Sequence, residues 1–224
     1  LYLNIPIFMA RLFPEDYDVV DNKRRFSGEL ATLLKLKEEL LDQYCVFHGV
    51  HWTKIEDAAS VYGEIDFLII NPYGKILAIE QKETSIERNK QGELVAIYSE
   101  SDGQRKEKKI HSQVARNIQS LRQEFSRRYK NQSLHVEHLL YLPTAIIEGE
   151  LPANLALGRV VDSSEAKYLP DIVRKILEDN PMPIGRQVAD ALTILEFLSE
   201  KANVVPQMGV LGRSAKEMTT RLSS

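Results

Sequence analysis

The segment 63–82 constrains the fold of this chain more than any other part of the sequence. It consists of two apolar runs joined by Asn71-Pro72-Tyr73-Gly74, and each run contains ionisable residues. Runs this apolar are typical of strands buried on both faces, and proline followed by glycine is typical of a tight turn. The segment therefore predicts a buried hairpin, in which charged groups are costly unless they are paired or bind a metal.

The position of the turn predicts which charged residues of the hairpin face one another. Folding back about Tyr73 places Asp66 opposite Glu80 and Glu64 opposite Lys82. Residues that lie opposite one another, or two apart along a strand, share a face of the sheet, so these four groups would crowd onto one side. The other side would be an apolar core face formed by Ile65, Phe67, Ile69, Leu77 and Ile79.

Two carboxylates and a lysine on one face indicate a divalent-metal site that cuts phosphodiester bonds. Magnesium prefers a few hard oxygen ligands, which Asp66, Glu80 and the backbone carbonyl of Gln81 could supply. Lys82 would lie beside the bound water, where it could orient that water or offset charge on the phosphate. The neighbouring carboxylates would keep this lysine charged. The alternative is a buried Glu–Lys ion pair that only fixes the register of the hairpin.

The rest of the chain predicts an α/β domain with a layered arrangement. Helical spacing is found at 27–41, 111–129, 164–179 (interrupted near Pro170) and 184–202, and strand-like runs at 44–51, 94–98, 136–142 and 159–161. A polar link is expected over 53–60. This order predicts a mixed sheet flanked by helices.

Composition limits the classes of protein to which the chain can belong. With 224 residues, 43% of them hydrophobic, it can bury one sizeable core, and a formal charge of −3 gives it no overall basic surface. The single cysteine, Cys45, excludes an internal disulfide and a cysteine-based zinc cluster and suits the cytoplasm. No apolar run approaches the roughly 20 residues of a membrane span. A Walker-type phosphate loop and a Gly-x-Ser-x-Gly elbow are both absent from the sequence.

The order and spacing of these pieces resemble the nuclease-related domain (NERD) family of the PD-(D/E)xK nuclease superfamily. The resemblance covers roughly residues 26–143 and depends on four short motifs: Phe26-Ser27-Gly28-Glu29, Gly63-Glu64-Ile65-Asp66, Glu80-Gln81-Lys82 and Gln113. It implies a restriction-endonuclease-like fold, with a central mixed four-stranded sheet flanked by helices. The expected division is an irregular lead-in over 1–25, the nuclease-like domain over 26–162 and a helical extension over 163–224.

The same resemblance implies a catalytic set and its partners. Asp66, Glu80 and Lys82 would be catalytic, and Glu29 would bind the metal or a water on it. Gln113, the last residue of the catalytic set, could contact the substrate or support the residues around the metal; as a polar residue at a helix start it could also do neither. The implied cofactor is Mg²⁺ or Mn²⁺ and the implied substrate is DNA, with RNA as the alternative. The resemblance also implies a helicase-type region in the same parent chain. Alternatives stay open: Glu29 could act only on the helix dipole, and the fold could serve as a binding module without turnover.

A basic stretch follows the hairpin in the sequence. Residues 105–130 contain nine basic residues and two acidic ones. Such a stretch could attract a phosphate backbone, with Lys108, Lys109 and Arg116 as candidate contacts; the alternative is a solvated amphipathic helix and a charged loop. His48 and His51 lie on a predicted strand with no third ligand in view, which favours packed or surface positions over a zinc site.

Overall fold

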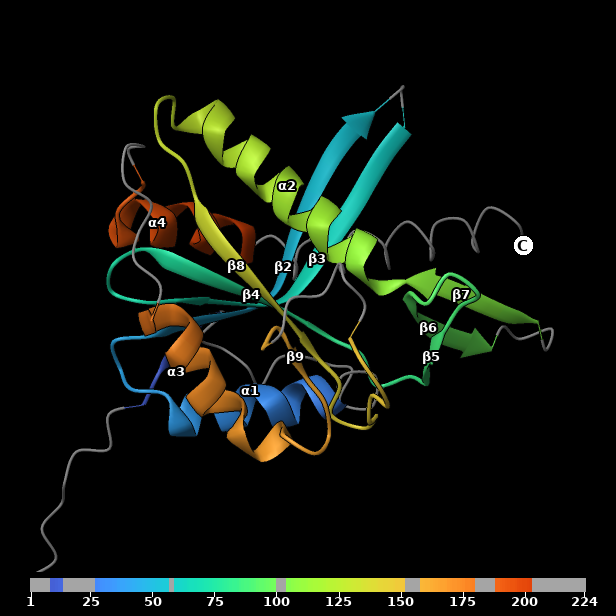
Figure 1. Ribbon diagram of the computed structural model, residues 1–224. Coiled ribbons are helices and arrows are strands. Elements are labelled where there is room, and N and C mark those ends of the chain that lie inside the picture. Colours follow the sequence, from blue (N-terminus) through green and yellow to red (C-terminus); the bar gives the residue numbers. More distant parts are fainter. Residues whose placement is uncertain are drawn as a thin grey trace, which may run out of the picture.

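The main body of the protein is a mixed six-stranded sheet between two pairs of helices (Figure 1). The computed structural model describes residues 9–13, 27–56, 59–99, 104–151, 158–179 and 188–202. The strands of this sheet are β1 (Arg11–Phe13), β2 (Cys45–Glu56), β3 (Ala59–Ile70), β4 (Lys75–Gln81), β8 (His135–Tyr141) and β9 (Val160–Val161), and they run in the order β1-β2-β3-β4-β8-β9. The predicted α/β class is confirmed. The central strands β2, β3, β4 and β8 correspond to the expected four-stranded mixed sheet. β9, which matches the run expected at 159–161, and β1 add short edges, whereas the run expected at 94–98 belongs to a second sheet.

In the described residues, the remaining elements are four α-helices, one short 3₁₀ helix and a second sheet. The helices are α1 (Ser27–Glu39), α2 (Ile110–Arg128), η2 (Ala166–Tyr168), α3 (Leu169–Asp179) and α4 (Ala191–Ala202). The second sheet contains β5 (Ile86–Arg88), β6 (Leu94–Ser99) and β7 (Arg105–Lys109). None of the helices that the structure describes has the length and apolar character to cross a membrane.

The predicted register of the hairpin is confirmed. β3 and β4 are antiparallel, and their pairs run from Phe67–Ile79 to Ile70–Ile76. In the turn, the side chain of Asn71 accepts hydrogen bonds from the backbone N–H groups of Tyr73 and Lys75, a local arrangement that favours asparagine at this position. β4 then pairs with β8 in parallel, which makes the sheet mixed.

Two hydrophobic clusters hold the helices to opposite faces of the sheet. One cluster joins the sheet to α2 and α4, and the other joins it to α1 and α3. The stripe predicted for α2 is buried as expected, and it consists of Val114, Ile118, Leu121 and Phe125. Fully burying one such side chain contributes about 1.5–3 kcal/mol, so packing on the sheet stabilises these helices more than their intrinsic helix propensity does.

Several boundaries differ from the prediction. The segment 53–60 is not a polar link, because β2 extends to Glu56 and β3 begins at Ala59. β-Branched residues such as Thr53 and Ile55 favour extended backbone there. β1 lies in the predicted lead-in, and β5 and β7 flank the one strand expected over 84–110. All residues of β7 are charged and exposed, so its sequence lacks the apolar alternation that predicts a strand. α4 begins at Ala191, and residues 203–224 of the predicted extension lie outside the described part of the chain.

We expect Gly74→Ala to destabilise the fold by about 2 kcal/mol or more. Gly74 has a φ of +80°, and a Cβ there would lie 2.7 Å from the backbone oxygen of Ala189, so strain and a backbone clash would add. Gly149 is a matched control, since its φ is +78° and nothing lies within 4 Å of an added Cβ. Chemical denaturation should show a loss of only about 1 kcal/mol for Gly149→Ala. Equal losses for both variants would contradict the clash.

Candidate active site

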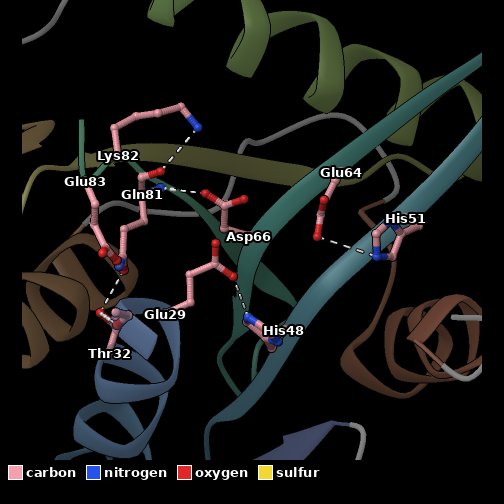
Figure 2. Close-up of polar contacts among 10 residues, drawn as sticks. Glu29, Thr32, His48, His51, Glu64, Asp66, Gln81, Lys82 and Glu83 are labelled. Carbon is pink, nitrogen blue, oxygen red and sulfur yellow. Dashed lines mark hydrogen bonds and ion pairs between the residues drawn. The ribbon is translucent and has the colours of Figure 1, made fainter. Parts of the chain in front are cut away.

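The predicted charged residues meet at the point where β3 separates from β4. The pairing of these strands ends at Phe67 and Ile79, one position before Asp66 and Glu80. β4 stays paired with β8 as far as Gln81, and the backbone N–H of Gln81 donates to Asp66 Oδ2 at 2.7 Å (Figure 2). The carboxylate thus replaces a neighbouring strand as the partner of that N–H group.

Lys82 is bound to the end of the same strand. Its Nζ lies 2.5 Å from Glu80 Oε1 and 3.2 Å from the carbonyl oxygen of Gln81. Burial alone would lower the pKa of Lys82, but the charges of Glu80 and Asp66 outweigh it and raise the pKa above its usual value. The expectation of a charged lysine therefore agrees with its surroundings.

Asp66 and Glu80 are two acids in one buried site. Burial, followed by the charge of Glu80, raises the pKa of Asp66 to about 8. Burial also raises the pKa of Glu80, although Lys82 opposes this. The negative charges of Glu64 and Glu29 also raise the pKa of Glu80. At neutral pH the two carboxylates resist ionising together unless a cation offsets their repulsion.

Two details of the predicted charge cluster are wrong. Glu64 does not pair with Lys82, because its carboxylate lies 3.5 Å from His51 Nε2. Ile65 packs in the cluster of α2 and α4, whereas Phe67 packs in the cluster of α1 and α3. The alternation of side chains therefore shifts by one residue between Ile65 and Phe67. The shift lies beside Gly49 of β2, whose φ of +62° interrupts the regular strand.

Glu29 reaches the site from the first turn of α1. Its Oε2 lies 2.8 Å from His48 Nε2, and the two side chains are 22% and 14% exposed. In Figure 2 the carboxylate of Glu29 lies between His48 and Asp66. Besides burial and the charge of Glu80, the charge of Glu29 raises the pKa of Asp66. The structure thus places Glu29 beside the predicted pair of acids.

The side chain of Gln81 ties α1 to the end of β4. Its Oε1 accepts from Thr32 Oγ1 at 2.7 Å, and its Nε2 donates to Glu83 Oε1 at 2.6 Å. Thr32 Oγ1 also lies 3.2 Å from the carbonyl oxygen of Gly28, so the two acceptors share its one hydroxyl proton. A Cβ at Gly28 would lie 1.6 Å from Glu83 Oε1, so a glycine here lets the helix begin directly against Glu83.

The oxygen atoms at this site suit a hard divalent cation. Asp66 and Glu80 offer carboxylates that repel one another, and the Gln81 carbonyl directly follows Glu80 in the sequence. Within the described ranges, no three His, Cys, Asp or Glu residues are grouped closely enough to hold an ion. A site with two carboxylates still fits Mg²⁺, which usually keeps several waters and substrate oxygens as ligands.

The basic stretch is divided between β7 and α2. Lys109 Nζ lies 2.7 Å from Glu93 Oε2, and Lys108 Nζ lies 4.9 Å from the ring centroid of Tyr98. Arg116 is exposed on α2. Gln113 is part of α2, but its side chain lies outside the described residues. The role of these four residues in substrate binding stays a prediction.

Three residues near the site were not found from the sequence. His48 hydrogen-bonds to Glu29 and Thr32 hydrogen-bonds to Gln81, and Tyr98 lies near enough to Lys82 to contribute to the rise in its pKa. Each belongs to an element that joins the hairpin only in the folded protein. The one local feature that indicated an irregularity near these residues was the isolated Gly49, because a glycine within a strand pattern often marks a bulge.

We expect the metal-free protein to lose about 2 kcal/mol of stability between pH 6.5 and 8.5. An acid whose pKa is raised in the folded state keeps a proton that the unfolded chain has lost. Asp66, with its pKa raised to about 8, thus stabilises the fold below that pH and ceases to do so above it. His135 acts in the opposite direction, but only below its ordinary pKa of 6.5. Denaturation in EDTA across this range would measure the slope, and constant or rising stability would contradict the assignment.

Comparison with known proteins finds one family. Residues 24–143, more than half of the chain, match the family model of the nuclease-related domain, NERD. The matched range contains Glu29, Asp66, Glu80 and Lys82. Neither the curated proteins nor the solved structures contain a significant match to the chain.

Proposed function

The chain belongs to the nuclease-related domain family, and from this we propose that it hydrolyses DNA phosphodiester bonds with the help of a divalent metal ion. The observation that carries the proposal is the pair formed by the partly buried Asp66 and the buried Glu80, with Lys82 bound to the end of the strand that carries Glu80. A cation bound between two acids that resist ionising together would offset the repulsion of their carboxylates.

Asp66, Glu80 and the carbonyl oxygen of Gln81 are the groups that would hold Mg²⁺ or Mn²⁺. When bound, the ion would supply Lewis-acid charge beside the scissile phosphate. The raised pKa values of the two acids support this role, since a cation there would favour their ionised forms.

Lys82 would act on the phosphate during hydrolysis. Its ammonium group remains charged in the site, so it can donate hydrogen bonds to a phosphate oxygen. As water attacks phosphorus, negative charge grows on the phosphate oxygens, and a fixed positive group favours that state. The bond from phosphorus to the leaving sugar oxygen then breaks, and a phosphate end and a hydroxyl end result.

A cleavage assay on the full 224-residue chain tests the proposal. We expect labelled DNA to be cut with Mg²⁺ or Mn²⁺ and to stay intact with EDTA. Parallel reactions with single-stranded DNA, double-stranded DNA and RNA would define the substrate. Glu80→Gln, which removes a charge but keeps the shape, should lower the rate at least 100-fold.

A non-catalytic binding module is the competing function. The absence of a three-residue metal group among the described residues favours it, and the fold itself does not decide between the two. Salt-sensitive DNA binding without cleavage in either metal would support the module and reject the nuclease. If DNA is neither bound nor cut, both functions are wrong.

A further inference from the structure

We propose that His48 is a positioning residue of this site, which holds Glu29 so that one of its carboxylate oxygens faces Asp66. The inference rests on the proposed metal-dependent function and assigns a role to a residue outside the four motifs that carry the family resemblance. It begins from the hydrogen bond between His48 Nε2 and Glu29 Oε2, 2.8 Å long and mostly shielded from solvent.

The direction of this hydrogen bond follows from the chemistry of the two groups. An ionised carboxylate can only accept hydrogen bonds, so the Nε2–H of His48 donates to Glu29. The bond occupies Oε2 and leaves Oε1 for other partners. Figure 2 shows Glu29 lying between His48 and Asp66, with its other oxygen on the side of Asp66.

His48 is itself fixed by the strand that carries it. It pairs in register with Phe67 of β3, and the two rings lie 5.1 Å apart. Phe67 is the residue of β3 at which the pairing with β4 ends, and its neighbour in the chain is Asp66. The histidine therefore links the position of Glu29 to the strand that carries Asp66.

Without His48, Glu29 would have a weaker hold on its position. Glutamate has three rotatable side-chain bonds, and Glu29 lies in the first turn of α1 with 22% of its side chain exposed. The other anchors of this turn, Thr32 and Gln81, fix the helix but do not contact the Glu29 carboxylate. Outer partners of this kind typically change metal affinity or activity about 10–100-fold when they are removed.

Three substitutions separate hydrogen bonding from packing. His48→Gln keeps an N–H donor near the position of Nε2 but loses the ring, His48→Phe keeps a ring against Phe67 but loses the donor, and His48→Ala loses both. At a given Mn²⁺ concentration, we expect the Gln variant to keep at least half of the wild-type rise in melting temperature. The Phe and Ala variants should need several-fold more Mn²⁺ than wild type to reach the same rise in melting temperature.

The same variants should differ in kinetics. The Phe variant should have a kcat about 10–100-fold lower than wild type, with KM for DNA changed less than twofold. Circular dichroism and melting in EDTA would check that each variant is folded. If His48→Phe behaves like wild type, or if His48→Gln is as impaired as His48→Ala, the positioning role is wrong. If the wild-type protein neither responds to metal nor cuts DNA, the proposed function fails together with this inference.

Discussion

Replacing Lys82 by alanine should reduce DNA cleavage at least 100–1,000-fold, the size of loss seen when one donor to a developing negative charge is removed. The ammonium group of Lys82 lies 2.5 Å from Glu80 and 3.2 Å from the carbonyl of Gln81. It is therefore placed at the groups that would hold the ion. Because a charge that acts in the transition state accelerates the reaction, kcat should fall while KM changes little.

The folded state has to be checked separately, since Lys82 also stabilises Glu80. Without it, the buried Glu80 would lose its nearest positive partner, and such a loss can cost several kcal/mol. Lys82→Met keeps most of the aliphatic stem and should fold more readily than the alanine variant. Lys167→Ala removes one positive charge from the surface beside Tyr168 and should leave cleavage unchanged. A rate for folded Lys82→Met within threefold of wild type would contradict the role given to the lysine.

Local sequence was enough to predict the centre of the site. Asp66, Glu80 and Lys82 belong to one hairpin whose turn chemistry fixes the register, so their approach needed no knowledge of distant segments. The order of apolar runs likewise predicted the central strands and the stripe of α2. Short-range periodicity and turn residues determine these features.

The surroundings of the site depend on contacts that are distant in the sequence. Glu29 contacts His48 only because α1 packs against the sheet beside α3. Thr32 contacts Gln81 for the same reason. Glu64 lies opposite His51 in the β2–β3 register, a pairing outside the hairpin from which the prediction was made. The alternation that the prediction assumed is shifted beside Gly49, where the backbone of β2 is irregular. A glycine permits a left-handed φ but does not require one, so the sequence alone left this shift undetermined.

Asp66→Asn should stabilise the metal-free protein at pH 8 and abolish its stabilisation by metal. The asparagine keeps a side-chain oxygen, which can still accept from the backbone N–H of Gln81. It has no carboxyl proton to lose, so the fall in stability expected for wild type between pH 6.5 and 8.5 should largely disappear. Because the pKa of Asp66 is raised to about 8, the advantage of the Asn variant over wild type should grow by about 2 kcal/mol between pH 6.5 and 8.5.

The metal response should change in the opposite sense. A ligand that binds only the folded state raises stability in proportion to the logarithm of its concentration, so wild-type melting temperature should rise with added Mn²⁺. Asp66→Asn should show no such rise and no cleavage, although it is the more stable protein without metal. Asp171→Asn, which removes an exposed carboxylate on α3, should leave both the pH slope and the metal response intact. Higher stability combined with lost function is a result that general misfolding cannot produce. If Asp66→Asn were less stable than wild type at pH 8 without metal, the ionised Asp66 carboxylate would not be destabilising the fold, and the assignment would be wrong.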